Sequence, residues 1–228
     1  TAHFYPKTFH CRSRLTLACQ MPCQFQTPDD ANFLGCTRIT SLKQKNKETI
    51  LNKLIVFTGG PGAGKTSVIE QLKTQGFICS PETGRHVIQR QVANHGSALP
   101  WNDKQAFRDE MMKAEVSNYR AFNVRQGDVF FDRSIVDVYG YSKLEQLPIS
   151  HELITHCQTL RYHSQVFIFP PWSSIFSNDE ERKQDFSEAV ATYQQMVNAY
   201  HKFGYQLIEV PKMSVEDRVA FILDSVIE

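Results

Sequence analysis

A glycine-rich segment, residues 59–67, has the residue types and spacing that suit polyphosphate binding. Gly59 and Gly64 lie five positions apart and precede Lys65 and Thr66, which matches the phosphate-loop pattern. Glycines let phosphates approach backbone N–H groups, while Lys65 would reach the β- and γ-phosphates and Thr66 would ligate Mg²⁺. The residues expected to contact an ATP-type nucleotide are Gly59, Gly60, Pro61, Gly62, Ala63, Gly64, Lys65, Thr66 and Ser67.

The elements that must position this loop lie directly on either side of it. The apolar run Leu54–Phe57 predicts a buried strand, and an amphipathic stretch from Lys65 to Thr74 predicts a helix. The free N–H groups and the dipole of that helix would point at the phosphates. A glycine-rich turn that binds nothing is the alternative, and the position of the pattern between strand and helix disfavours it.

Strands and helices are expected to alternate along the rest of the chain. Short apolar runs predict further strands near residues 77–79, 129–132, 166–169 and 206–210, with helices between them. This alternation predicts an α/β fold with a parallel sheet that is covered on both faces. Ligands of such sheets bind beyond the carboxyl ends of the strands, so the residues that follow each strand are the candidates for a site.

Two of these candidates, Asp132 and Arg133, close the strand near residues 129–132. A carboxylate at the end of an apolar strand can hold Mg²⁺, often through water, opposite Thr66. The alternative for Asp132 is a carboxylate that caps the start of a helix. Arg133 would contact a phosphate of the substrate, or it would form a structural ion pair.

A second group of charged residues is expected near the γ-phosphate, where a second substrate would approach. Glu82 is placed to accept the proton of an attacking hydroxyl, and Arg85 to hold an anionic group of the substrate. Their alternative is a first-turn glutamate favoured by the helix dipole and a solvated arginine. Arg182, in the charged run 178–185, would neutralise charge on the transferred phosphoryl group, unless this run is a solvated helix face.

Composition narrows the possible classes of protein. A chain of 228 residues accommodates one α/β domain with or without an appendage, and its net charge of +1 favours neither nucleic acid nor anionic membranes as a partner. No apolar run approaches the length of a membrane span. The six cysteines are too few for a disulfide scaffold of this size, so we expect reduced thiols and a cytoplasmic protein.

Residues 1–50 differ from the rest and are expected to form an N-terminal extension ahead of the domain at 51–228. The extension has poor periodicity and few acidic residues, a composition that resembles a transit peptide. It is also a possible contact for a protein partner. Whether it binds metal stays open, because its cysteines lack the paired spacing of common zinc modules: Cys11, Cys19, Cys23 and Cys36.

Several motifs together resemble the small bacterial predicted ATPases of AAA type, a family similar to nicotinamide riboside kinase and other nucleoside-kinase-like phosphate-loop proteins. The resemblance covers about Lys53 to Glu228 in the same order. It implies a three-layer fold with a five-stranded parallel sheet in the order 2-3-1-4-5, and an ATP site with Mg²⁺. The motifs are Gly59–Ser67, Pro81–Arg85, Leu99–Trp101, Phe130–Ser134 with Val136–Asp137, Pro170–Trp172, and Asp179–Arg182 with Phe186, Glu188 and Ala189. Ser134 stands where the family motif has glycine.

Three functions remain in competition at this point. The first is an enzyme that transfers the γ-phosphoryl group of ATP to a small, nucleoside-like acceptor, with Lys65, Asp132, Glu82 and Arg182 as catalytic residues. The second is an ATP-hydrolysing switch that acts on a protein partner through residues 1–50. A GTPase is the third, and the missing guanine-reading Asn-Lys-x-Asp motif argues against it.

Overall fold

The computed structural model of the protein describes residues 52–176 and 185–227. These residues lie in the second of the chain's two units, residues 47–228. The expected extension at residues 1–50, with its four cysteines, lies outside the described residues. Its boundary with the domain, its metal binding and its partner contact therefore stay predictions.

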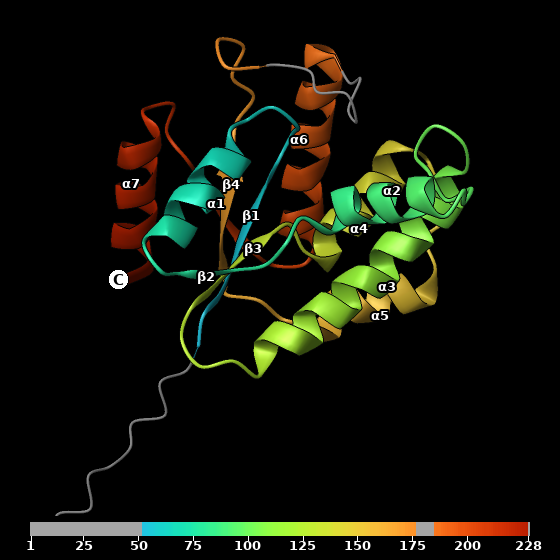
Figure 1. Ribbon diagram of the computed structural model, residues 1–228, viewed down its shortest axis with the longest axis horizontal. Helices are drawn as coiled ribbons and strands as arrows, with labels where there is room; N and C mark the ends of the chain where they lie inside the picture. Colours follow the sequence, from blue (N-terminus) through green and yellow to red (C-terminus); the bar gives the residue numbers. More distant parts are fainter. Residues whose placement is uncertain (1–51, 177–184, 228) are drawn as a thin grey trace, which may run out of the picture. The chain divides into compact units, whose positions relative to one another are not determined.

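A five-stranded parallel sheet forms the centre of the domain, as Figure 1 shows. Its order is β2-β3-β1-β4-β5, which confirms the expected order. The strands are β1 (Leu54–Gly59), β2 (Ile78–Cys79), β3 (Val129–Asp132), β4 (Gln165–Phe169) and β5 (Gln206–Glu209). The helices are α1 (Lys65–Thr74), α2 (Thr83–Ala93), α3 (Lys104–Asn123), α4 (Ile135–Leu144), α5 (His151–Thr159), α6 (Phe186–Lys202) and α7 (Val215–Ile227).

Each face of the sheet is buried against its own set of helices. Because side chains alternate along a strand, Leu54 and Val56 of β1 face one way and Ile55 and Phe57 the other. The first pair packs with residues of α3, α4, α5 and α6, and the second with residues of α1 and α7. Helices lie on both sides of the strands in Figure 1, which gives the expected three layers.

A third, smaller core lies away from the sheet, between α2 and α3. Val87 and Ile88 of α2 pack there against Leu99 and against Phe107 of α3. Asp103 begins α3 as its N-cap, with a side-chain oxygen that accepts a hydrogen bond from the backbone N–H of Ala106. These contacts place α2 along α3 and close one side of the space beyond the sheet.

The turn from β3 into α4 is fixed by one buried carboxylate, Asp137. One of its oxygens accepts hydrogen bonds from the Thr58 hydroxyl (2.6 Å) and from the Arg133 guanidinium (3.2 Å). The other accepts from the Ser134 backbone N–H (3.0 Å) and from the Tyr200 hydroxyl. Ser134 caps the helix in return, since its side chain accepts from Val136 N–H. Ser134 and Asp137 together thus form a capping box.

The Tyr200 hydroxyl should contribute measurably to stability through this carboxylate. We expect Tyr200→Phe to lower the free energy of unfolding by about 1–2 kcal/mol, because a buried carboxylate loses one of its donors. Urea unfolding followed by circular dichroism measures the difference. Tyr193→Phe is the matched control, since its hydroxyl donates to Glu209 at the surface (2.6 Å) and should contribute less than about 0.5 kcal/mol. Equal losses in the two variants would contradict this assignment.

Candidate active site

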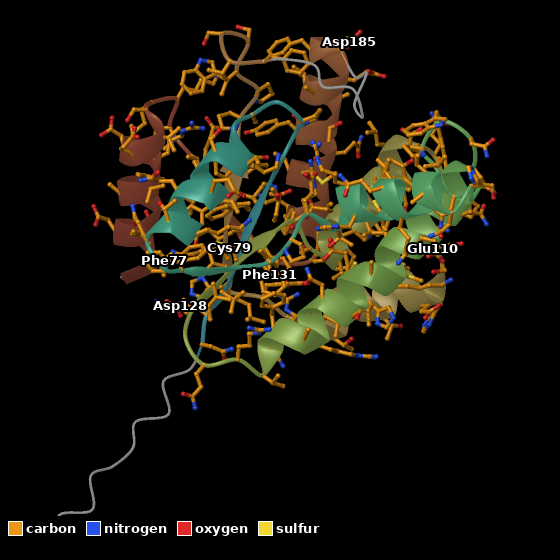
Figure 2. The ribbon with its side chains drawn as sticks, viewed as in Figure 1. Phe77, Cys79, Glu110, Asp128, Phe131 and Asp185 are labelled. Atoms are coloured by element: carbon orange, nitrogen blue, oxygen red, sulfur yellow. The ribbon has the colours of Figure 1, made fainter. Side chains whose placement is uncertain are left out.

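The candidate site residues gather at the carboxyl edge of the sheet. β1 ends in the phosphate loop, β3 ends at Asp132, and the chain enters α2 at Glu82 after β2. Figure 2 shows Asp128, just before β3, and Asp185, just before α6, at opposite ends of the sheet. The described site residues lie at the end where Asp185 is.

The phosphate loop has a backbone that a side chain at its glycines would disrupt. Gly59 has φ of +126°, and a Cβ there would lie 2.4 Å from the carbonyl oxygen of Phe169 on β4. Gly64 precedes α1 with φ of +80° and makes no side-chain cap. The first turn of α1 contains no acidic residue, so no carboxylate of this turn would compete with an anionic ligand for its N–H groups and the positive end of its dipole.

Lys65 and Thr66 begin α1 in different environments. Lys65 is buried, and its ammonium group donates a hydrogen bond to the carbonyl oxygen of Gly60 (2.7 Å) within the loop. Thr66 is exposed at the next position. The loop is therefore followed by a buried ammonium group, that of Lys65, and by a hydroxyl group accessible to solvent, that of Thr66.

Asp132 lies beside the start of the loop, because β3 pairs with β1 so that Asp132 stands opposite Phe57. The side chain is buried, and its Oδ1 has no hydrogen-bond partner among the described residues. Burial raises the pKa of Asp132, and the charges of Lys65 and Arg133 act against this increase. An oxygen ligand with unused capacity beside a phosphate loop fits a site for Mg²⁺, with Thr66 as the second protein ligand.

Glu82 and Arg133 approach each other beyond the ends of β2 and β3. The Nε of Arg133 lies 3.9 Å from Glu82 Oε1, and the Nε of Arg85 lies 3.4 Å from Glu82 Oε2. Arg133 has φ of +74° and donates from Nη1 to the carbonyl oxygen of Gly59 (3.1 Å). The predicted substrate-binding arginines thus both contact the predicted base, and Arg133 connects it to the phosphate loop.

Arg182, the fourth predicted catalytic residue, lies outside the described residues, as does the rest of the charged run from 178 to 184. Its role stays a prediction. Among the described residues there is no group of three or more His, Cys, Asp or Glu side chains that would hold a metal ion. A Mg²⁺ ion at Thr66 and Asp132 would take its remaining ligands from water and from a bound nucleotide.

A cavity of about 140 Å³ opens next to Glu82 and Arg133, between α2, α3, α4 and α6. Most of its wall is apolar. The polar side chains that line it are Glu82, Glu115, Arg133, Asp137, Tyr141 and Thr192. The space has the mixed character of a small-molecule site, with few polar groups in an apolar wall.

Glu115 was not predicted as a site residue, although it is the most deeply buried carboxyl of this wall, 3% exposed. Burial raises its pKa to about 8. A hydrogen bond with Thr83 and the charge of Arg133 act against this increase, and the charges of Asp137 and Asp132 act with it. The sequence did contain a signal. Glu115 follows Phe107 and Met111 at intervals of four, so a carboxylate occupies the apolar face of the helix.

Arg218 is a second residue that sequence reasoning missed. Its guanidinium lies over the Trp172 ring, 5.6 Å from the centroid, and a Cβ at Gly64 would lie 2.5 Å from its Nη1. The same nitrogen is 3.5 Å from the carbonyl oxygens of Ala63 and Gly64. Arg218 therefore supports the phosphate loop from α7, more than 150 positions further along the sequence.

None of the helices in the described part of the chain is long and apolar enough to cross a bilayer.

Comparisons with known proteins agree with this architecture. A family model described as an AAA domain matches residues 54–218. A comparison with curated proteins gave no match. Among solved structures, the NadR protein in complex with NR is 18% identical with a TM-score of 0.56, over 77% of this chain and 50% of the NadR chain. This chain thus spans about half the length of NadR.

Two kinases give similar values. Deoxyadenosine kinase from M. mycoides is 12% identical with a TM-score of 0.56, over 75% of this chain and 97% of that chain. Thymidylate kinase from Candida albicans is 15% identical with a TM-score of 0.56, over 77% of this chain and 91% of the thymidylate kinase chain. At these identities the likeness establishes the fold, a phosphate-loop kinase fold. Because the family model spans well over half of the sequence, the chain belongs to this AAA domain family.

Proposed function

We propose that residues 51–228 form an ATP-dependent phosphotransferase that moves the γ-phosphoryl group of ATP to a hydroxyl group of a small, nucleoside-like acceptor. The observation that carries this proposal is the position of Glu82 and Arg133. These side chains line the cavity, and Arg133 also bonds to Gly59 at the start of the phosphate loop. A nucleotide on the loop and an acceptor in the cavity would meet at these two residues.

The nucleotide would bind with its phosphates against the backbone N–H groups of the loop and of the first turn of α1. Its oxygens would replace the Gly60 carbonyl as partners of the Lys65 ammonium group. Thr66 and Asp132 would hold Mg²⁺, which when bound neutralises charge on the β- and γ-phosphates. Arg218 would keep the loop carbonyls turned outward, so that the loop N–H groups face the phosphates.

Glu82 would act as the general base. Its carboxylate would accept the proton of the acceptor hydroxyl while the hydroxyl oxygen bonds to the γ-phosphorus and the bond to the β–γ bridging oxygen breaks, which releases ADP. Arg133 and Arg85 would keep the carboxylate oriented, at 3.9 and 3.4 Å. Arg182 would add positive charge beside the transferred group.

The cavity favours a transferase over the hydrolytic switch. A switch needs a water molecule and a partner surface, whereas this cavity is a mostly apolar space beside the base. The same fold in a deoxyadenosine kinase and in a thymidylate kinase supports this choice. ATP consumption measured against a panel of nucleosides, nucleotides and sugars tests it. One strongly stimulating compound would support the transferase, and no stimulation across the panel would contradict it and favour the switch.

Lys65→Ala should abolish turnover while the protein stays folded. Removal of a cation that contacts the transferred phosphates should lower kcat by at least about 10²–10³-fold, because the charge that develops in the transition state loses its stabilisation. Phosphoryl transfer from radiolabelled ATP measures the loss, and thermal unfolding confirms the fold. Lys73→Ala is the matched control on the same helix, where Lys73 pairs with Glu70 at the surface. Normal ATP turnover by Lys65→Ala would show that the phosphate loop is not the site.

Glu82→Gln should separate chemistry from nucleotide binding. The amide cannot accept the proton, so transfer should fall by about 10²–10⁴-fold, while the Kd for ATP measured by calorimetry should change by no more than about twofold. Glu110→Gln is the control, because Glu110 pairs with Arg90 and Lys113 on the outer side of α3. A loss of ATP affinity in Glu82→Gln that matches the loss of transfer would contradict the role of general base.

A further inference from the structure

Two polar atoms of the cavity residues have no hydrogen-bond partner among the described residues: Oε2 of Glu115 and the hydroxyl oxygen of Tyr141. Glu115 projects from α3 and Tyr141 from α4, and both residues line the cavity. Buried polar atoms in native proteins nearly always have partners, because an unpaired one lowers stability. Two such residues around one cavity indicate that a ligand completes their bonding.

The other polar groups of the cavity are already in use. Asp137 accepts five hydrogen bonds, from Thr58, Arg133, Tyr200 and both the backbone N–H and the hydroxyl of Ser134. Thr192 donates its hydroxyl hydrogen to the carbonyl oxygen of Glu188, one turn earlier on α6 (2.8 Å). Glu82 and Arg133 belong to the reaction centre. Glu115 and Tyr141 are therefore the groups in the described wall with capacity left for recognition.

The charge of the wall limits what it can recognise. Three carboxyl groups line the cavity against one guanidinium, that of Arg133. Glu115 has no ion pair within 4 Å in the described part of the chain. Burial without an opposite charge at contact distance favours the protonated carboxyl, which outweighs the opposing effect of a hydrogen bond with Thr83 on its pKa. A protonated Glu115 offers an O–H donor and a C=O acceptor side by side. An anionic group placed here would meet Asp137 and Glu82 in an apolar surrounding.

The apolar wall suits a flat group. The ring of Phe107 packs edge-on against the ring of Tyr141, with centroids 5.7 Å apart. Two methionines, Met111 and Met196, also line the space, and their flexible thioethers pack well against rings. The cavity thus combines aromatic and sulfur contacts for ring faces with hydrogen-bonding groups for a ring edge.

We propose that Glu115 and Tyr141 recognise the head group of the acceptor, and that this head group is a planar ring that is uncharged or cationic and bears both a donor and an acceptor, such as a carboxamide or a nucleobase edge. Compounds that carry a carboxylate on the ring are rejected. The inference rests on the proposed function, since it takes the ligand of the cavity to be the phosphoryl acceptor. To the proposed function it adds the class of acceptor that the cavity binds, and it names Glu115 and Tyr141 as the residues that determine this preference.

Matched pairs of ribosides test the charge rule. Nicotinamide riboside with nicotinic acid riboside, and uridine with orotidine, differ by a ring carboxylate. Calorimetry on the full chain should show, for at least one pair, that the member without the carboxylate binds about tenfold or more tightly. Equal binding within both pairs, tighter binding of the carboxylates, or no binding of any of the four would overturn the inference.

Variants of the two residues test the assignment. Glu115→Gln keeps a donor and an acceptor and should keep the preference, whereas Glu115→Leu and Tyr141→Phe should weaken binding of the preferred member about fivefold or more. The Leu and Phe variants should not lower Tm, because Oε2 of Glu115 and the Tyr141 hydroxyl have no hydrogen-bond partner among the described residues. A purely structural role would lower Tm. Unchanged binding in both would overturn the inference.

Phosphoryl transfer followed in parallel separates this inference from the proposed function. If the preferred riboside binds with the expected variant pattern but is not phosphorylated, the recognition stands and the transferase assignment fails. If the carboxylate member is phosphorylated as well as its partner, the transferase assignment stands and the recognition by Glu115 and Tyr141 fails.

Discussion

The described site depends on the buried carboxylate of Asp137. It binds Thr58 of β1, Tyr200 of α6 and both Arg133 and Ser134 of the turn after β3. Removal of any of these donors would leave the buried charge of the Asp137 carboxylate with less compensation. Because every alternative arrangement is therefore unfavourable, these residues are held in one geometry. Because Arg133 holds a left-handed backbone conformation, which is unfavourable for a residue with a side chain, the turn needs this external support. The hydrogen bonds of Asp137 therefore also determine the position of Arg133 beside Glu82.

The phosphate loop is likewise held in place by residues outside it. Its glycines allow the backbone to pass close to β4 and to the guanidinium of Arg218, so neighbouring elements determine its shape as much as its own residues do. The sheet then brings three separate segments to one edge, namely the loop after β1, the turn after β3 and the start of α2. Parallel strands make this possible, because all their carboxyl ends point the same way.

The sequence was sufficient for the features that depend on local pattern. The loop at 59–67, the strands and the order of the sheet could be predicted from spacing, alternation and family resemblance. Glu115, Tyr141 and Arg218 could not, because their roles arise from contacts between distant segments. Glu115 becomes buried when α2 packs along α3, and Arg218 meets the loop through α7. A charged residue on an otherwise apolar helix face was the available sign, and it did not indicate which cavity the residue would line.

The small core between α2 and α3 has a consequence for how such a protein diversifies. Val87, Ile88, Leu99 and Phe107 form a core of their own, which Met111 of α3 joins to the sheet core that contains Leu54. Helices α2 and α3 also form one side of the cavity. Replacements confined to Ile88 and Phe107, which line the cavity, therefore change its wall without removing a side chain from the packing of the strands, whereas Met112 and Val116 of α3 pack against the strands. The positions of Ile88 and Phe107 are therefore the natural starting point for reshaping the cavity by laboratory evolution.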